Sequence, residues 1–294
     1  MRSPRGEPAR LILSIVAGVL EALDAPYLQR ALAAGVVLAV PLGLLGSWIV
    51  LRELAFFAHA VGVATFPGVV VGFALPSLGP FAGALLAALA FSGAVSASEA
   101  DHRLRGGAVT GFTLAVSLAV GAVLLTVLGA GAAPVDRLLF GSLLAVSSGD
   151  VLLCVVAAGV SVGVLIPMMP RLTATTFDGA WARPAGAREQ RTASIVLVLV
   201  SLVVVCALPA VGSLLVSALL VVPAATARLL VTRLGPMLAW TTGLCVVETI
   251  CGLLAAWSLD LPPGAAIAAV AGLAFGLVAG MRAAASRLGR MAPA

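Results

Sequence analysis

The chain contains nine apolar runs that could form membrane spans, most of them close to 20 residues long, and this repetition restricts the fold more than any other feature. A helix of about 20 apolar residues crosses the hydrocarbon core of a bilayer, and such runs are typical of membrane proteins. The composition agrees, because 62% of the 294 residues are hydrophobic and 10% are charged. The sequence therefore predicts an all-α, polytopic transmembrane helical bundle of eight or nine spans. The expected spans are residues 30–50, 55–75, 79–98, 108–128, 151–168, 193–208, 211–230, 237–257 and 264–281.

The apolar runs divide the chain into three expected parts. Residues 1–29 form an N-terminal tail with an interfacial helix, residues 30–284 form the transmembrane domain, and residues 285–294 form a cytoplasmic C-terminal tail. The run Leu11–Leu23 is too short for a span, so we interpret it as the interfacial helix. A signal peptide and an additional crossing are the alternatives, because basic residues precede this run.

Every one of the 17 basic residues is an arginine, and the arginines lie mainly between the apolar runs. Cytoplasmic loops of membrane proteins are rich in basic residues. We therefore place the loop with Arg103 and Arg105, the loop Pro170–Thr192 and the C-terminus on the cytoplasmic side. Because the basic residues do not cluster, we expect contact with membrane lipid and no nucleic-acid partner.

The absence of lysine excludes several functions. A P-loop ATPase needs the lysine of its Walker A motif, and Schiff-base chemistry also needs a lysine. The sequence shows no Gly-rich phosphate loop, no Ser/His/Asp set and no CxxC pair. We expect a chain that is not an enzyme and binds no cofactor, so that ATP in any ATP-driven role is bound by a partner subunit. The four cysteines lie in apolar runs, and we expect no structural disulfide.

The run Val211–Leu230, VGSLLVSALLVVPAATARLL, meets Pro223 after about three turns of helix. Proline has no amide hydrogen, so a helix that passes through it loses a backbone hydrogen bond and bends. Lipid cannot satisfy the freed carbonyl, so such a break is tolerated where neighbouring helices or a cavity cover it. This run predicts a bent helix inside the bundle. The alternative is an ordinary spanning helix with a proline kink.

Two ionisable residues lie within apolar runs: His59 in FFAHAVGVATFPG and Glu248 in LCVVETICG. A charge at mid-bilayer costs about 2.5–3.5 kcal/mol on insertion scales, so each residue is a candidate for a substrate pathway. Imidazole and carboxylate groups both bind divalent metals, and His59 is the candidate metal ligand. The alternative for each is a hydrogen-bonded structural role. Cys245 and Cys251 flank Glu248 at three-residue steps and are interpreted as packing residues.

The loop Pro170–Thr192 places Asp178, Ala182 and Gly186 at steps of four residues. This spacing brings them to one side of a helical turn, where small residues let another surface approach closely. A solvated loop between two spans is the alternative.

Five stretches together resemble the membrane permease subunits of ABC importers for zinc, manganese and iron. The stretch LFGSLLAVSSGDV is similar to the family pattern LFG-x-[IL]-L-x-V-[ST], and FDGAWARPAG is similar to its D-x-x-x-A-x-x-x-G loop. The run with Ser217, Pro223 and Arg228 is similar to the family consensus along its whole length. In chain order the five stretches are Gly43–Leu75, Leu139–Val151, Phe177–Gly186, Val211–Leu230 and Leu259–Ile267.

The resemblance implies a multi-pass protein of a prokaryotic plasma membrane that pairs with a second permease subunit, most simply as a homodimer. It also implies a cytoplasmic ATP-binding subunit, an extracytoplasmic solute-binding protein and a divalent metal ion as cargo. Phe177–Gly186 would form the coupling helix that inserts into the ATPase, with Asp178, Ala182 and Gly186 at the matching positions.

The resemblance also bears on the metal. Family members carry an Asp and a His four residues apart on the second span, and the matching positions here hold His59 and Val63. An imidazole suits zinc better than manganese or calcium, so zinc is the first expected cargo, with manganese or iron next. Two alternatives remain open: the same architecture moving a metal chelate or another small solute, and a gradient-driven transporter that uses Glu248 as a proton relay.

Overall fold

The computed structural model describes residues 26–75, 77–99, 107–129, 146–177 and 189–291, and these ranges are helical apart from short connections. Eight helical segments in these ranges are long and apolar enough to cross a membrane; α3 and α4 together make one of them, and α11 has a shorter apolar stretch. The predicted all-α polytopic bundle is therefore confirmed. The helices are α2 (Pro26–Leu51), α3 (Ala55–Ala64), α4 (Phe66–Ala74), α5 (Gly79–Glu99), α6 (Gly107–Leu128), α8 (Ser148–Phe177), α10 (Glu189–Val211), α11 (Ser213–Leu230), α12 (Leu234–Leu259) and α13 (Pro263–Met291).

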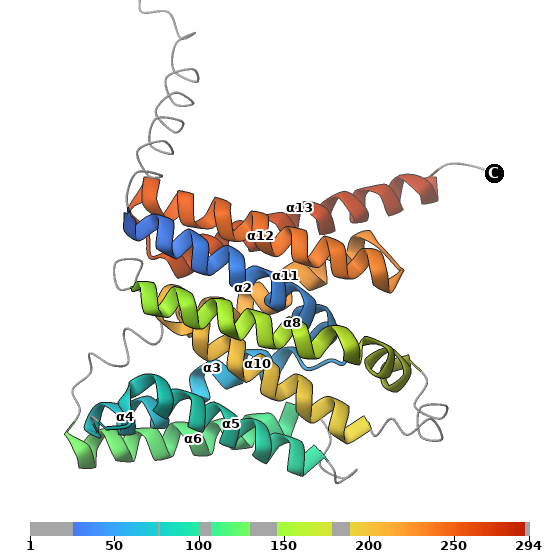
Figure 1. Ribbon diagram of the computed structural model, residues 1–294. Helices are drawn as coiled ribbons and strands as arrows, with labels where there is room; N and C mark the ends of the chain where they lie inside the picture. Colours follow the sequence, from blue (N-terminus) through green and yellow to red (C-terminus); the bar gives the residue numbers. More distant parts are fainter. Residues whose placement is uncertain (1–25, 76, 100–106, 130–145, 178–188, 292–294) are drawn as a thin grey trace, which may run out of the picture.

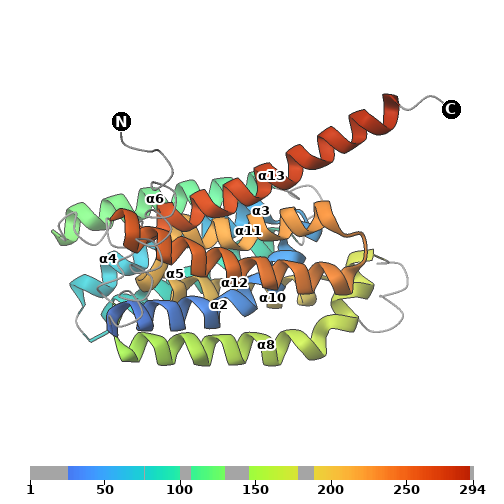
Figure 2. The same cartoon turned by 90° about the horizontal axis from the view of Figure 1, so that it is seen from above.

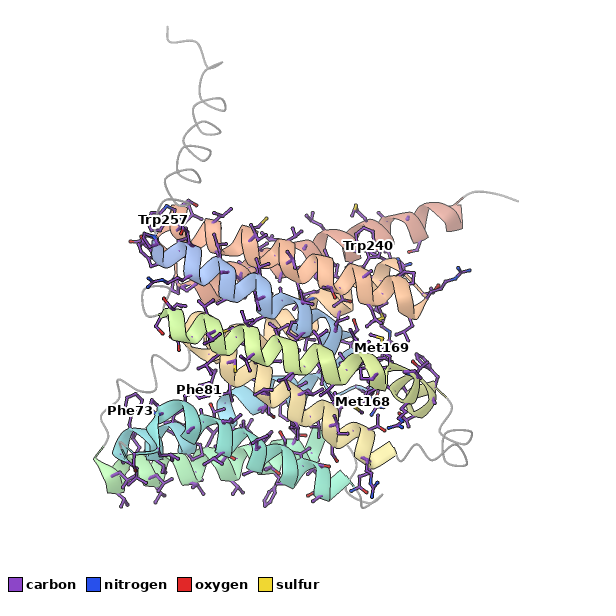
Figure 3. The ribbon with its side chains drawn as sticks, viewed as in Figure 1. Phe73, Phe81, Met168, Met169, Trp240 and Trp257 are labelled. Carbon is purple, nitrogen blue, oxygen red and sulfur yellow. The ribbon has the colours of Figure 1, made fainter. Side chains whose placement is uncertain are left out.

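The helices form one bundle, with α4, α5 and α6 together at one edge and α12 and α13 at the other (Figure 1). Trp257 and Trp240 lie toward opposite ends of α12 (Figure 3). Seventeen residues of helix separate them, which corresponds to about 25 Å. Trp257 also contacts Tyr27 at the start of α2, with ring centroids 5.5 Å apart. Tryptophan and tyrosine favour the membrane interfaces, so these rings indicate where the two interfaces cross the bundle.

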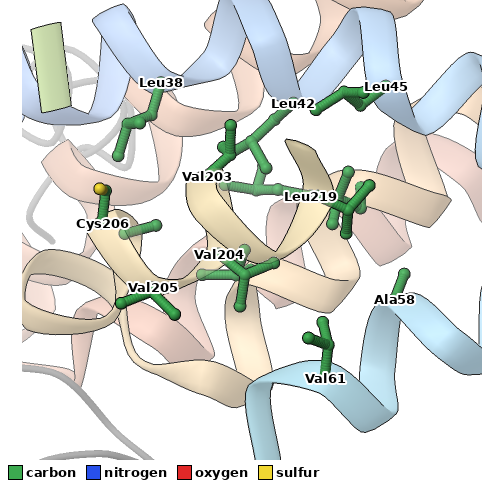
Figure 4. Close-up of a cluster of buried hydrophobic side chains, with 14 of the residues drawn as sticks. Leu38, Leu42, Leu45, Ala58, Val61, Val203, Val204, Val205, Cys206 and Leu219 are labelled. Carbon is green, nitrogen blue, oxygen red and sulfur yellow. The ribbon is translucent and has the colours of Figure 1, made fainter. Parts of the chain in front are cut away.

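The core lies between α2, α10, α11 and α3 (Figure 4). The five consecutive residues from Val203 to Ala207 are all buried, so α10 is covered on every side at this level. Leu38 and Leu42 of α2 lie beside this part of α10, and Leu45 lies beside Leu219 of α11. A helix that is apolar all round belongs in the interior, and this explains why the run over residues 193–208 has no polar face.

Backbone contact between glycines joins α4 to α5. A Cβ atom added at Gly68 would overlap the carbonyl group of Gly83, and one added at Gly83 would overlap the carbonyl group of Gly68. One turn farther along, a Cβ atom added at Gly72 would overlap the carbonyl group of Gly79. Pairs of small residues four positions apart let membrane helices approach closely, where dispersion and hydrogen bonds replace the hydrophobic effect.

Two of the expected spans differ from the helices that the structure shows. The single span expected over residues 55–75 is divided at Thr65 into α3 and α4, with Pro67 in the first turn of α4. The span expected to end at Met168 continues as α8 to Phe177, with Pro167 and Pro170 inside the helix. The expected end of this span lies between the two prolines, but α8 continues through both because its neighbours hold it in place, with Leu165 and Leu172 buried on either side.

The helical structure also crosses both expected domain boundaries. It begins at Pro26, before residue 30, and α13 continues beyond residue 284 to Met291. The end of α13 projects from the bundle in both views (Figures 1 and 2). The expected interfacial helix Leu11–Leu23 lies outside the described residues and stays a prediction.

The helix α11 passes through Pro223, which is buried. In an α-helix, the amide that proline lacks would bond to the carbonyl four residues earlier, here Leu219. The thiol of Cys245 on α12 donates to that carbonyl at 3.1 Å. A neighbouring helix therefore satisfies the group that proline frees, as we expected for a break inside the bundle. Cys245 was interpreted as packing, and the structure assigns it this hydrogen bond as well.

We predict that Cys245→Val lowers the thermal stability of the purified protein in detergent. Valine fills a similar volume but donates no hydrogen bond, and an unsatisfied buried carbonyl costs about 1–3 kcal/mol. Thermal unfolding followed by circular dichroism measures the change. Cys251→Val is the matched control, because Cys251 is exposed on the same helix. Equal melting temperatures for the two variants would contradict a role of Cys245 in satisfying the Leu219 carbonyl.

Candidate functional site

His59 lies on α3, and its ring Nδ1 is 3.2 Å from the Oγ of Ser217 on α11. These atoms are within hydrogen-bond distance, with the donor set by the histidine tautomer. Ser217 is buried, whereas His59 is exposed on the surface of the single chain. The structure thus joins two residues that the sequence analysis selected separately, one for its ionisable ring and one for its place in the run Val211–Leu230.

The core packing of α3 sets the direction of His59. Phe57, Ala58 and Val61 are buried, and the Phe57 ring stacks on Phe91 of α5 with ring centroids 5.7 Å apart. Because these side chains point inward, His59 and Val63, four residues apart, share the opposite side of the helix. Val63 is partly buried and provides no ligand atom. This face of α3 therefore offers a single imidazole rather than a pair of ligands.

The exposure of His59 within a span has a physical consequence. Polar side chains in membrane helices almost always face the bundle interior or a water-filled cavity, because contact with lipid is costly. The described part of this chain leaves His59 uncovered. The cover must therefore come from water, from another chain or from both.

Glu248 lies in a different environment, on α12 and only 1% exposed. Neither carboxylate oxygen has a hydrogen-bond partner among the described residues. Cys245, one turn earlier, contacts α11, and Gly252, one turn later, lies against Ile267 of α13. Glu248 shares this stripe of the helix, so it faces the junction of α11, α12 and α13. A buried carboxylate without a partner is costly and suits a proton or a cation.

The two ionisable candidates do not form one metal centre. The ranges that the structure covers contain no group of three or more His, Cys, Asp or Glu side chains that could hold a metal ion. The helix α11 lies between the two, since Ser217 contacts His59 and Leu219 contacts Cys245. This chain therefore offers two separate polar positions, one on its surface and one in its interior.

Arg228 and Phe177, two of the remaining predicted residues, lie at helix ends. Arg228 is exposed in the last turn of α11, where a cation interacts favourably with the helix dipole. Phe177 is the last residue of α8 and is 62% exposed. Asp178, Ala182 and Gly186 lie outside the described residues, so the coupling helix stays a prediction.

Sequence reasoning did not give Arg52 a role. Its Nε donates to the Thr176 Oγ1 at 3.0 Å, and its Nη2 donates to the Thr175 Oγ1 at 2.7 Å. Arg52 was within one of the stretches that carry the family resemblance, which was the available signal. The sequence could not reveal its partners, because they lie more than 120 positions away.

The comparisons with known proteins agree with the fold. The model of the ABC 3 transport family matches residues 24–282. The manganese transport system membrane protein MntC of Halalkalibacterium halodurans is 33% identical over 87% of both chains. The manganese import system permease protein ScaB of Streptococcus parasanguinis is 31% identical over 82% of this chain and 85% of its own.

A solved structure supports the same relationship. PsaBC from Streptococcus pneumoniae in complex with Fab superposes with a TM-score of 0.79 at 26% identity, covering 90% of this chain and 95% of the other. The family model spans far more than half of the sequence, and the resemblance inferred from the five stretches is confirmed. This chain therefore belongs to the ABC 3 transport family.

Proposed function

We propose that this chain is the permease subunit of an ABC importer that carries a divalent transition-metal ion across the plasma membrane of a prokaryote. Family membership and the names of the relatives support this function. The observation that carries it is the exposed His59, which lies within a span and contacts Ser217 of α11. Because this imidazole needs water or protein beside it, the α3–α11 face is the wall of a pathway that a second permease subunit completes.

The work of transport comes from outside this chain. Without lysine, the chain has no Walker A motif, so ATP is bound and hydrolysed by a separate cytoplasmic subunit. The segment Phe177–Gly186 begins at the last residue of α8 and is the proposed contact with that subunit. A solute-binding protein delivers the cargo on the opposite side, and alternating access moves it across.

Two observations bear on which metal is carried. The relatives are named for manganese, whereas the ligand that this chain offers at position 59 is an imidazole, which suits zinc. We propose zinc as the first cargo on the chemistry of the donor, and the assays below include manganese because of the relatives. A pathway needs only weak binding, since the ion must also leave, so one imidazole from each of two copies is enough.

We predict that His59→Ala lowers zinc uptake about tenfold. Loss of a residue that supports a metal site lowers metal affinity or activity about 10–100-fold, and we expect the lower end of that range. The measurement is uptake of radioactive zinc by proteoliposomes that contain the permease, its ATP-hydrolysing subunit and its binding protein. Thr126→Ala is the control, because Thr126 is an exposed polar residue of α6 that bonds within its own helix. His59→Asp should shift the preference toward manganese. Normal zinc and manganese uptake by His59→Ala would exclude a pathway role.

We predict that Ala182→Trp or Gly186→Trp abolishes transport-coupled ATP hydrolysis, because a large side chain prevents the segment from entering a cleft of the ATPase. ATP hydrolysis stimulated by the loaded binding protein is the readout. Ala180→Trp is the control, since position 180 lies on the other side of the predicted turn. Unchanged stimulation in the first two variants would remove the coupling assignment, and uptake without ATP would indicate a gradient-driven transporter.

We also propose that Glu248 takes part in transport, although it lies in the interior on the other side of α11 from His59, and we predict that Glu248→Gln lowers metal uptake without loss of thermal stability. A neutral amide of the same shape costs less to bury than an ionised carboxylate, so folding is preserved while the charge is removed. Uptake and unfolding temperature are measured on the same preparation. Asp260→Asn, at the exposed end of α12, is the matched control, because asparagine tolerates its left-handed backbone. Undiminished uptake would assign Glu248 a structural role.

A further inference from the structure

Arg52 connects the end of α8 to the junction between α2 and α3. Its guanidinium donates two hydrogen bonds to neighbouring hydroxyls, those of Thr175 at 2.7 Å and Thr176 at 3.0 Å. Arg52 is partly buried and Thr175 is buried. A planar guanidinium that donates in two directions resists displacement more than a single hydrogen bond does, and each bond is strengthened by the charge.

The backbone holds Arg52 in a defined position. The amide of Leu54 donates to the Ile49 carbonyl at 2.9 Å, and the amide of Glu53 donates to the Val50 carbonyl at 3.3 Å. These two bonds are those of a Schellman motif at the end of α2. Glu53 has the left-handed conformation, with φ of 60°, which usually requires glycine. The junction therefore keeps an unfavourable backbone conformation because the surrounding contacts hold it.

The junction leads directly to His59. The helix α3 is short: it begins at Ala55, ends at Ala64 and contains ten residues. The left-handed Glu53 precedes it, and Thr65 with Pro67 follows it. A helix that follows such an irregular turn can change its direction there as a rigid unit, because the turn absorbs the change of backbone angle. Displacement of Arg52 would act at the N-terminal end of α3.

Thr175 and Thr176, the partners of Arg52, lie next to the segment that we propose binds the ATPase. Thr176 precedes Phe177, where α8 ends, and the segment proposed to contact the ATPase begins there. The same helix continues without interruption through Pro167 and Pro170 into the core. Thr175 and Thr176 therefore lie directly before the segment proposed to contact the ATPase, and movement at the end of α8 displaces them.

We propose that the contact of Arg52 with Thr175 and Thr176 is the mechanical link that passes movement at the ATPase contact to the helix that carries His59. This inference rests on the function proposed above. The contact makes α8 and the start of α3 move together, so that a change at the end of α8 reorients His59 against Ser217. The competing role is purely structural, with Arg52 only stabilising the C-terminal ends of α2 and α8 as a cation.

The test compares coupling in the complete complex in proteoliposomes, measured as zinc ions taken up per ATP hydrolysed. Arg52→Ala and the double variant Thr175→Val/Thr176→Val should each hydrolyse ATP at a rate close to that of the wild type and lose at least tenfold in uptake per ATP. The variant that combines all three changes should be no worse than either, because residues in one network do not act additively. Arg52→Lys, which provides no planar fork, should recover only part of the coupling.

Two variants on α8 serve as matched controls. Thr173→Val removes a hydroxyl that donates to the Met169 carbonyl within the same helix. Arg171→Ala removes an exposed guanidinium. Both should couple as the wild type does, because neither removes a hydrogen bond between α8 and the α2–α3 junction.

The outcomes separate the link from the proposed function. Wild-type vesicles that take up no metal would overturn the proposed function and the link together. Wild-type uptake with undiminished coupling in the Arg52 and threonine variants would overturn the link alone. A loss of uptake and ATP hydrolysis in equal proportion would also overturn it, because that is the result of a structural role. If Arg52→Ala does not assemble, the threonine double variant, which preserves side-chain volume, decides the question.

Discussion

Lipid offers no hydrogen-bond partner to a backbone, and this constraint explains most of the structure. The described chain is helical almost throughout, and its irregular points lie where other groups of the bundle take over. The thiol of Cys245 satisfies the Leu219 carbonyl that Pro223 frees. The C-terminal end of α2 is capped by backbone hydrogen bonds around Glu53, which has a left-handed backbone conformation. At both of these interruptions the backbone therefore finds a hydrogen-bond partner inside the protein.

The candidate site lies beside these interruptions. His59 is on the short helix α3, between the breaks at Glu53 and Thr65. Ser217 is in the first turns of α11, directly after the break at Gly212, where φ is 79°. A broken helix gives a membrane protein an element that moves independently of its neighbours, and polar groups on such elements can meet a cargo in one state and release it in another. The position of His59 therefore connects the irregular backbone to the proposed transport.

Periodicity and composition predicted much of the fold correctly. Runs of apolar residues indicated the spans, because only a long apolar helix fits the bilayer. The errors were at prolines. Pro167 and Pro170 were interpreted as the end of a span, yet they lie inside α8. The division at Thr65 was also missed, because the run over residues 55–75 is predominantly apolar on both sides of Thr65, so hydropathy alone does not mark a break there.

The sequence by itself determined that this chain is a lysine-free, multi-span helical bundle with ionisable side chains at His59 and Glu248, because charge and apolar length are properties of residues in order. Only the tertiary structure decided what those residues face. It places His59 beside Ser217 on an uncovered surface, buries Glu248 without a partner among the described residues, and brings Arg52 to Thr175 and Thr176. Such contacts join residues more than a hundred positions apart, and they depend on how whole helices pack rather than on any local pattern.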